Sequence, residues 1–288
     1  MNLPDPVVQV SSAVEVAPDV VVIPNGHVGL VPNIGVIGGT DAVLVVDTGL
    51  GAANASEVLA FASEIARGRR IHLTTTHFHP EHAFGAAVFV GSYLVNRAQA
   101  LDLARKGAGY LEMFRGFGGA VADRLADVSV PVPDEVFDGV RTLDLGGRSV
   151  VLRPTGRGHT LGDQVVEVPD AGVLFTGDLA ETGQFAIFPW FPPHDTDVSG
   201  VGWIEVMDRL VASAPRIVVP GHGTVGGPEV LAGMRDYLRE LRDETWRRRD
   251  SADVAAEVRA VLVERYPEWT GQEWIERGVG CFCNFSAD

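Results

Sequence analysis

Short apolar runs separated by glycine, proline and asparagine dominate the first part of the chain and predict a series of strands. They are residues 20–23, 34–37, 42–46 and 71–76, the last of them rich in β-branched side chains. The first of these strands are expected to form a meander that feeds one sheet. Between residues 54 and 67 the apolar positions recur with helical spacing, and we expect Asn54 to cap that helix.

The second half repeats the strand-rich pattern and adds longer helices. Its strands are predicted at residues 148–153, 164–168, 173–176 and 217–219. Before this half, a shorter strand is predicted within residues 88–95. Helices are predicted at residues 201–212, 228–249, 253–266 and 272–277, with Pro228 as the first residue of the second.

The segment between the two halves is less regular. Residues 97–117 have a helical pattern that Gly107 and Gly109 interrupt, so two helical pieces are expected. Residues 120–136 are predicted to be a connecting region. We interpret residues 100–135 as an insertion that lies over the sheet edge, or as a lid over a site.

Composition and charge restrict the classes of function. With 288 residues, of which 46% are hydrophobic and 21% charged, the chain is a typical globular protein. A net charge of −15 argues against non-specific nucleic-acid binding, which needs a basic surface. No membrane association is expected, because no apolar run approaches the ~20 residues that span a bilayer. Since no secretory signal is visible, we expect a cytoplasmic protein, with Cys281 and Cys283 as reduced, partly buried thiols.

The main chemical signal is the segment His77-Phe78-His79-Pro80-Glu81-His82. Pro80 cannot continue a strand ladder and pushes His79 toward an extended backbone, so the segment must be a loop that leaves the preceding strand. In an extended stretch His77 and His79 point the same way and reach one ion together, while Glu81 and His82 provide a second pair of donors. Zinc, manganese and iron accept such ligands. Four of them within six positions favour a metal site over a chance polar loop.

Four further candidates follow apolar strands, and glycine or proline flanks each of them. They are Asp47, His159, Asp178 and His222. A rigid scaffold presents catalytic groups in this way, at strand ends along one rim of a sheet. We therefore expect these side chains to converge on the histidine-rich loop.

In combination these residues resemble the signature of the metallo-β-lactamase superfamily, in its glyoxalase II-like group. The matching segments are His77-x-His79-x-Glu81-His82, Gly158-His159-Thr160, Thr176-Gly177-Asp178 and Pro220-Gly221-His222-Gly223. The resemblance covers about residues 15–225 and implies an α/β fold, a four-layer αβ/βα sandwich of two mixed β-sheets. Residues 228–288 would be a C-terminal helical extension of a single domain over residues 1–288.

The resemblance also implies a site with two divalent metal ions, with zinc expected and iron or manganese as alternatives. His77, His79 and His159 would hold the first ion, Glu81, His82 and His222 the second, and Asp178 would bridge both. Asp47 and Asp163 match acidic positions that orient imidazoles, with a structural turn as the alternative. The family usually has Asp where this chain has Glu81, so the affinity and identity of the second ion stay open.

The activity that this resemblance implies is hydrolysis by a metal-bridging hydroxide, with Asp178 as bridging ligand and proton carrier. The substrate would be an activated acyl compound such as a thioester, a lactone or a related ester or amide. Alternatives are a mononuclear iron persulfide dioxygenase, a β-lactamase-like amide hydrolase and a non-catalytic binding module. The full ligand set favours two metals and therefore argues against the mononuclear dioxygenase. Glu181 stands where quorum-signal lactonases usually have Tyr, which counts against a close match to those enzymes.

Two aromatic segments are candidates for a substrate pocket. The first contains Phe185, Phe188, Trp190, Phe191 and His194, and the second contains Tyr110, Phe114 and Phe117. If they line the site, the small-molecule substrate has a hydrophobic part. The alternative is that the aromatic rings fill the core and that His194 is a solvated loop residue. The sequence leaves a monomer and a homodimer equally open.

Overall fold

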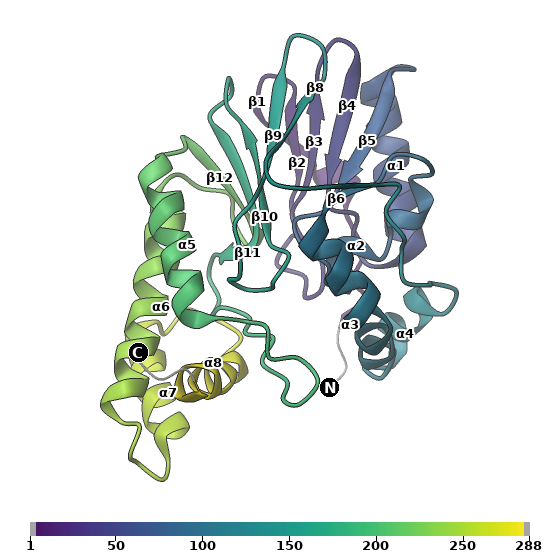
Figure 1. Cartoon of the computed structure of the whole chain (residues 1–288). Helices are drawn as coiled ribbons and strands as arrows, with labels where there is room; N and C mark the ends of the chain where they lie inside the picture. Colours follow the sequence, from purple (N-terminus) through teal and green to yellow (C-terminus); the bar gives the residue numbers. More distant parts are fainter. Residues whose placement is uncertain (1–3, 285–288) are drawn as a thin grey trace.

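The apolar runs of the first half form one five-stranded sheet. In the computed structural model, which describes residues 4–284, its strands lie in the order β1-β2-β3-β4-β5 (Figure 1). They are β1 (Val14–Ala17), β2 (Val20–Ile23), β3 (Ile34–Gly38), β4 (Ala42–Val46) and β5 (Arg70–Thr74). The first four are antiparallel neighbours, whereas β5 runs parallel to β4. Helix α1 (Gly51–Ala66) makes the crossover that a parallel pair requires.

The second half forms another five-stranded sheet in the order β12-β11-β10-β9-β8. Its strands are β8 (Arg141–Asp144), β9 (Ser149–Pro154), β10 (Gln164–Val168), β11 (Val173–Glu181) and β12 (Ile217–His222). Only β11 and β12 are parallel, and helix α5 (Gly200–Ser213) connects them. A separate parallel pair consists of β6 (Leu94–Asn96) and β7 (Glu135–Phe137).

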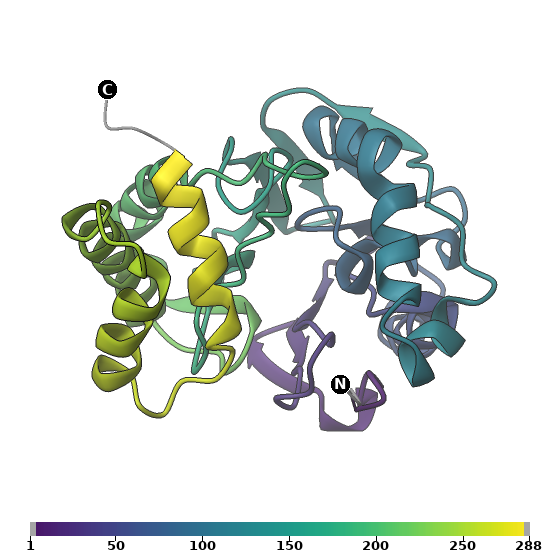
Figure 2. The same ribbon diagram turned by 90° about the horizontal axis from the view of Figure 1, so that it is seen from below.

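The remaining helices lie outside the two sheets. They are α2 (Pro80–Ala83), α3 (Arg97–Arg115), α4 (Gly119–Leu125), α6 (Glu229–Arg247), α7 (Val254–Arg265) and α8 (Glu273–Asn284), with 3-10 turns at Val10–Ser12 and Ala86–Val88. Figure 2 shows the helices of the two halves on opposite sides of the strands.

Three groups of buried side chains hold these layers together. Leu44 and Phe175 belong to the group between the two sheets. Val58 of α1 belongs to the group outside the first sheet, and Leu238 and Ile275 belong to the group outside the second. Each fully buried apolar side chain of this size stabilises the fold by ~1.5–3 kcal/mol. Helix, sheet, sheet and helix thus form the predicted four-layer αβ/βα sandwich.

The C-terminal helices share one apolar core with α5. Leu238 of α6 and Phe282 of α8 lie in the same buried group as Trp203 of α5.

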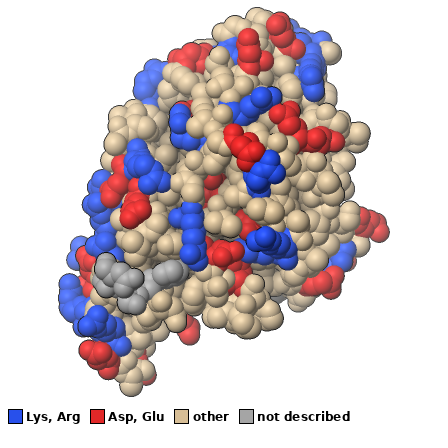
Figure 3. Space-filling view, in the orientation of Figure 1, with Lys and Arg blue, Asp and Glu red and all other residues tan. Residues whose placement is uncertain are grey.

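Within residues 4–284, no helix has the length and apolar content needed to cross a bilayer. On the face drawn in Figure 3, acidic and basic side chains are intermixed.

Helix α3 is continuous, so the prediction of two pieces over residues 97–117 was wrong. Gly107 serves close packing, because a Cβ added there would lie 2.5 Å from Cγ1 of Val130. Each glycine costs a helix about 1 kcal/mol relative to alanine. Burial of Leu103, Leu111 and Phe114 on the inner face outweighs that cost.

Asn54 does not cap α1, which begins at Gly51 after Leu50. Its buried side chain accepts a hydrogen bond from the backbone N–H of Val8 (3.0 Å) and donates to the carbonyls of Pro6 (2.7 Å) and Leu50 (2.9 Å). Asn54 therefore fixes the N-terminal segment against the helix. A residue that bonds to distant backbone looks the same in the sequence as a cap.

Several element bounds also differ from the predicted ones. The strand predicted within residues 88–95 begins only at Leu94 and ends at Asn96, and residues 120–136 contain most of α4 and the start of β7. The edge strands β1 and β8 were not predicted, because nearly all of their side chains are exposed or only partly buried and no apolar run marks them. Helix α8 extends to Asn284, where Cys281 is buried and Cys283 exposed, both as free thiols.

Candidate metal centre

The predicted metal ligands come from both sheets and meet at one end of the sandwich. His77 and His79 follow β5, and Pro80 begins α2, which carries Glu81 and His82. The other three are His159 in the turn between β9 and β10, Asp178 within β11 and His222 at the end of β12. Since β11 runs on to Glu181, Asp178 is a strand residue and not, as predicted, the residue after a strand.

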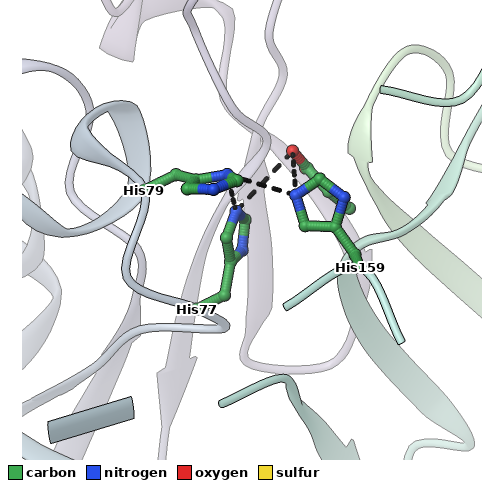
Figure 4. Close-up of side chains that lie close together, drawn as sticks. His77, His79 and His159 are labelled. Atoms are coloured by element: carbon green, nitrogen blue, oxygen red, sulfur yellow. Dashed lines mark hydrogen bonds and ion pairs between the residues drawn. The ribbon is translucent and has the colours of Figure 1, made fainter. Parts of the chain in front are cut away.

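The first group consists of His77, His79, His159 and Asp178. Nε2 of His77 and Nε2 of His159 lie 3.0 and 3.1 Å from Nδ1 of His79. Figure 4 shows the three imidazoles pointing toward one another. All three are buried, with at most 5% of the side chain exposed. Three nitrogens that face one point are arranged as ligands of one ion.

The second group consists of Glu81, His82, His222 and again Asp178. In each group, one donor atom per residue lies within 4.8 Å of the others. The additional methylene of Glu81 therefore does not remove its carboxylate from the group.

Asp178 is shared between the two groups, one oxygen to each. Its Oδ2 lies 3.7 Å from Nε2 of both His77 and His159, and its Oδ1 lies 3.2 Å from Nε2 of His82 and 3.5 Å from Nε2 of His222. Gly221 leaves the space that the Asp178 carboxylate occupies, because a Cβ added at Gly221 would overlap Oδ1 of Asp178.

Several buried atoms of the centre have no hydrogen-bond partner within residues 4–284. Among them are both carboxylate oxygens of Asp178, Oε2 of Glu81, and Nε2 of His82 and of His222. A buried polar atom without a partner destabilises a fold. Because these atoms converge and their chemistry suits a divalent cation, the residues fit a metal site.

Asp47 orients His82 from the side opposite to Asp178. Its Oδ2 lies 2.9 Å from Nδ1 of His82, and it also accepts hydrogen bonds from the backbone N–H (2.7 Å) and the hydroxyl (3.0 Å) of Thr76. Asp47 has a φ of 67°, a left-handed conformation that is uncommon outside glycine. The hydrogen bonds to Thr76 hold Asp47 in this conformation.

The histidines of the first group are neutral at pH 7. Burial lowers the pKa of His77 and His79 well below the usual value, and lowers that of His159 to about 4. A metal ligand must be an unprotonated imidazole. These three rings are therefore ready to bind an ion without losing a proton.

The second group differs in its protonation. Burial alone would lower the pKa of His82, but the carboxylates of Asp178 and Asp47 outweigh burial and raise it well above the usual value. Burial raises the pKa of Glu81 to about 7. For Asp178, burial is outweighed by His82, His222 and His77, which hold the pKa of its carboxyl well below the usual value. A cation in this group must displace a proton.

Asp163 closes the turn that carries His159. Its carboxylate accepts hydrogen bonds from the backbone N–H of Thr160 (2.9 and 3.0 Å) and from the Thr160 hydroxyl (2.5 Å). Burial raises the pKa of Asp163 to about 8. These contacts favour the structural turn over direct orientation of an imidazole.

The aromatic pocket candidates separate into core and site residues. Phe185 and Phe188 are fully buried and pack against Tyr237 and Trp203, which favours the alternative that they fill the core. Phe114 is also buried, where its ring packs against Phe117 in the first half.

The other candidates lie in the loop before α5 and on α3. Trp190 is half-buried beside α8, and the ring of Phe191 lies 6.4 Å from that of Tyr110. His194 is exposed on the loop. Of all these aromatic residues, Tyr110 is the one whose ring stacks on a histidine of the first group, His79.

The sequence reasoning missed an ionic cluster next to Tyr110. Lys106 of α3 lies 3.3 Å from Asp102, 3.0 Å from Asp195 and 2.7 Å from Asp197. One signal was available, since Asp102, Lys106 and Tyr110 are spaced four residues apart and so share one face of a helix.

The same fold occurs in solved structures of metallo-β-lactamases. The metallo-beta-lactamase from Pontibacter korlensis matches with a TM-score of 0.62 and 20% identity over 79% of this chain and 98% of that one. DIM-1 metallo-beta-lactamase matches with a TM-score of 0.62 and 16% identity, over 79% of this chain and 96% of that one. At these identities the likeness concerns the fold.

Two relatives are more similar in sequence. A metallo-beta-lactamase type 2 from Bacteroides fragilis is 26% identical over 222 residues, which are 75% of this chain and 79% of the relative. The human acyl-coenzyme A thioesterase MBLAC2 is 28% identical over 217 residues, 69% of this chain and 75% of the relative. The model of the metallo-beta-lactamase superfamily matches residues 27–222, a range that contains all seven clustered side chains. This chain belongs to the metallo-β-lactamase superfamily.

Proposed function

We propose that this chain is a hydrolase of activated acyl compounds that works with two divalent metal ions, with zinc as the expected metal. His77, His79 and His159 would hold one ion, Glu81, His82 and His222 the other, and Asp178 both. A small-molecule thioester is the proposed substrate.

The position of Asp178 is the observation that carries the proposal. One carboxylate can join two ions that lie ~3.5–4 Å apart. Its two oxygens face different groups of ligands, at 3.7 Å from His77 and 3.2 Å from His82. A single ion would leave one of these oxygens buried without a partner.

The residues of the chain would prepare this site in three ways. Divalent ions, when bound, polarise a carbonyl oxygen and lower the pKa of water toward neutrality. The neutral imidazoles of the first group provide lone pairs at pH 7. Asp178 has a depressed pKa and stays ionised, which supports its role as a ligand more than that of a proton carrier. Asp47 restricts the rotation of His82.

Similarity supports the thioester, since the human relative at 28% identity is an acyl-coenzyme A thioesterase. The Bacteroides fragilis relative at 26% identity is a metallo-beta-lactamase and makes β-lactam hydrolysis the second candidate. The two differ in the bond that is cleaved, so one panel of substrates separates them.

The test combines metal analysis with that panel. Purified protein should contain two divalent ions per chain and should hydrolyse acyl-coenzyme A thioesters faster than a chromogenic cephalosporin or a simple lactone. Removal of the ions by a strong chelator should abolish the activity, and added Zn²⁺ should restore it. One iron per chain together with oxygen-dependent persulfide oxidation would overturn the proposal in favour of the dioxygenase alternative. Full activity in the chelator would exclude any metal mechanism.

A further inference from the structure

One aromatic ring of helix α3 lies directly against the candidate metal centre. The ring of Tyr110 stacks on the imidazole of His79 with a centroid distance of 4.9 Å and an interplanar angle of 25°. It also meets Phe78 edge-on at 4.9 Å and 80°. Tyr110 and His79 are only 6% and 5% exposed. A buried ring from a separate element therefore covers one face of this imidazole.

His79 lacks the second hydrogen bond that His77 and His82 have. Nδ1 of His82 lies 2.9 Å from Asp47, and Nδ1 of His77 lies 3.1 Å from the hydroxyl of Thr76. In His79 it is Nδ1 that faces the other imidazoles, and Nε2 has no hydrogen-bond partner within residues 4–284. A metal-ligating histidine usually donates its second N–H to a fixed acceptor, which sets the ring orientation. For His79, stacking has to supply that orientation.

Tyr110 is fixed in turn by the ionic cluster beside it. Its hydroxyl donates a hydrogen bond to Oδ2 of Asp195 (2.8 Å), and Lys106 lies 3.0 Å from Oδ1 of the same carboxylate. Lys106 also lies 3.3 Å from Asp102, which accepts a hydrogen bond from the backbone N–H of Gly162 (3.1 Å). Gly162 belongs to the turn that carries His159, so the cluster connects α3 to two segments around the first group.

We propose that Tyr110 is a positioning residue for His79. Its ring, held by Asp195 and Lys106, keeps the imidazole in the orientation in which Nδ1 faces the ion of the first group. This inference rests on the proposed metal-dependent function. It assigns to Tyr110 an effect on the affinity of the first group, with the second group of Glu81, His82 and His222 unaffected.

Metal affinity tests this role without reference to activity. The full chain, freed of metal with a chelator, is titrated with Zn²⁺ and with Co²⁺ against a chromophoric competitor, for the wild type, Tyr110→Phe, Tyr110→Leu and Asp195→Asn. Tyr266→Phe is a matched control, because Tyr266 packs on Trp269 at 4.4 Å and 30° and donates its hydroxyl to Glu240 at 2.9 Å, away from the centre.

Tyr110→Leu should weaken one of the two ions, the ion of the first group, ~10–100-fold, as loss of an orienting group does. Tyr110→Phe and Asp195→Asn, which keep the ring, should weaken it by a smaller factor of about 3–10. The other ion, and both ions in Tyr266→Phe, should bind within about twofold of the wild type. If Tyr110→Leu does not fold, Tyr110→Phe and Asp195→Asn decide by the same criterion.

Wild-type affinity in the folded Tyr110 variants, or an equal loss in Tyr266→Phe, would overturn this inference and leave the proposed function intact. A wild-type chain that takes up no divalent ion would overturn the proposed function, and this inference with it.

Discussion

Oδ2 of Asp47 lies 2.9 Å from Nδ1 of His82, whose other nitrogen lies 3.2 Å from Oδ1 of Asp178. One imidazole thus connects a carboxylate that follows β4 with a carboxylate on β11, and so links the two sheets. In the metal-free protein His82 carries a proton, because both carboxylates stabilise its charged form.

The two metal ions should therefore differ in the pH dependence of their binding. The histidines of the first group are neutral at pH 7, so an ion binds there without displacing a proton. An ion in the second group must displace the proton of His82 and, in the fraction of molecules in which Glu81 is protonated near pH 7, the proton of Glu81 as well. The affinity of the second ion should rise with pH, up to about tenfold per pH unit for each proton released. Calorimetric titration with Zn²⁺ at pH 6, 7 and 8, in buffers of different ionisation enthalpy, counts these protons. Equal proton release by both ions would contradict this assignment.

Replacement of the shared carboxylate should disable both halves of the centre. In Asp178→Asn the amide nitrogen cannot act as a ligand, so we expect fewer than two ions per chain and hydrolysis reduced at least ~100-fold. Elemental analysis and steady-state kinetics measure the two effects. Asp208→Asn, at a half-exposed carboxylate of α5 paired with Arg239, serves as the control and should retain full activity. An active Asp178→Asn enzyme would exclude the bridging role.

A single methyl group at Gly221 should have a similar effect. In Gly221→Ala the added Cβ would overlap Oδ1 of Asp178, so the carboxylate must move. We expect a large loss of metal content and of activity. Gly233→Ala is the matched control, since this position on α6 has open space around it and alanine should stabilise the helix by ~0.5–1 kcal/mol. Comparable activity in the two variants would show that the carboxylate tolerates the displacement.

The structure assigns Phe185 to the core, and its replacement should act on stability alone. Its ring is fully buried against Tyr237 and Trp269. Phe185→Leu should lower the free energy of unfolding by about 1–3 kcal/mol, because a cavity remains in the core. The KM for the best substrate should not change. Urea unfolding and kinetics test this, and a several-fold rise in KM at unchanged stability would restore Phe185 to the pocket.

Much of the fold was predictable because its signals are local. Strands such as β3 and β4 are continuous apolar runs that are buried on both faces, and α6 has a clear apolar stripe. The edge strand β8 was missed, since its exposed side chains leave no such run. Asn54 was misinterpreted because two of its hydrogen-bond partners, Pro6 and Val8, lie almost fifty residues away in the chain.

The sequence alone determined the chemistry of the centre, since the residue types and their places after strands name the candidate ligands. Only the tertiary structure decided the rest: which oxygen of Asp178 faces which group, that Glu81 still reaches its group, and that Tyr110 packs on His79 while Phe185 does not approach the centre. The reason is physical. The ligand types and strand ends are properties of short segments, whereas stacking, burial and shared protons depend on contacts between residues far apart in the chain.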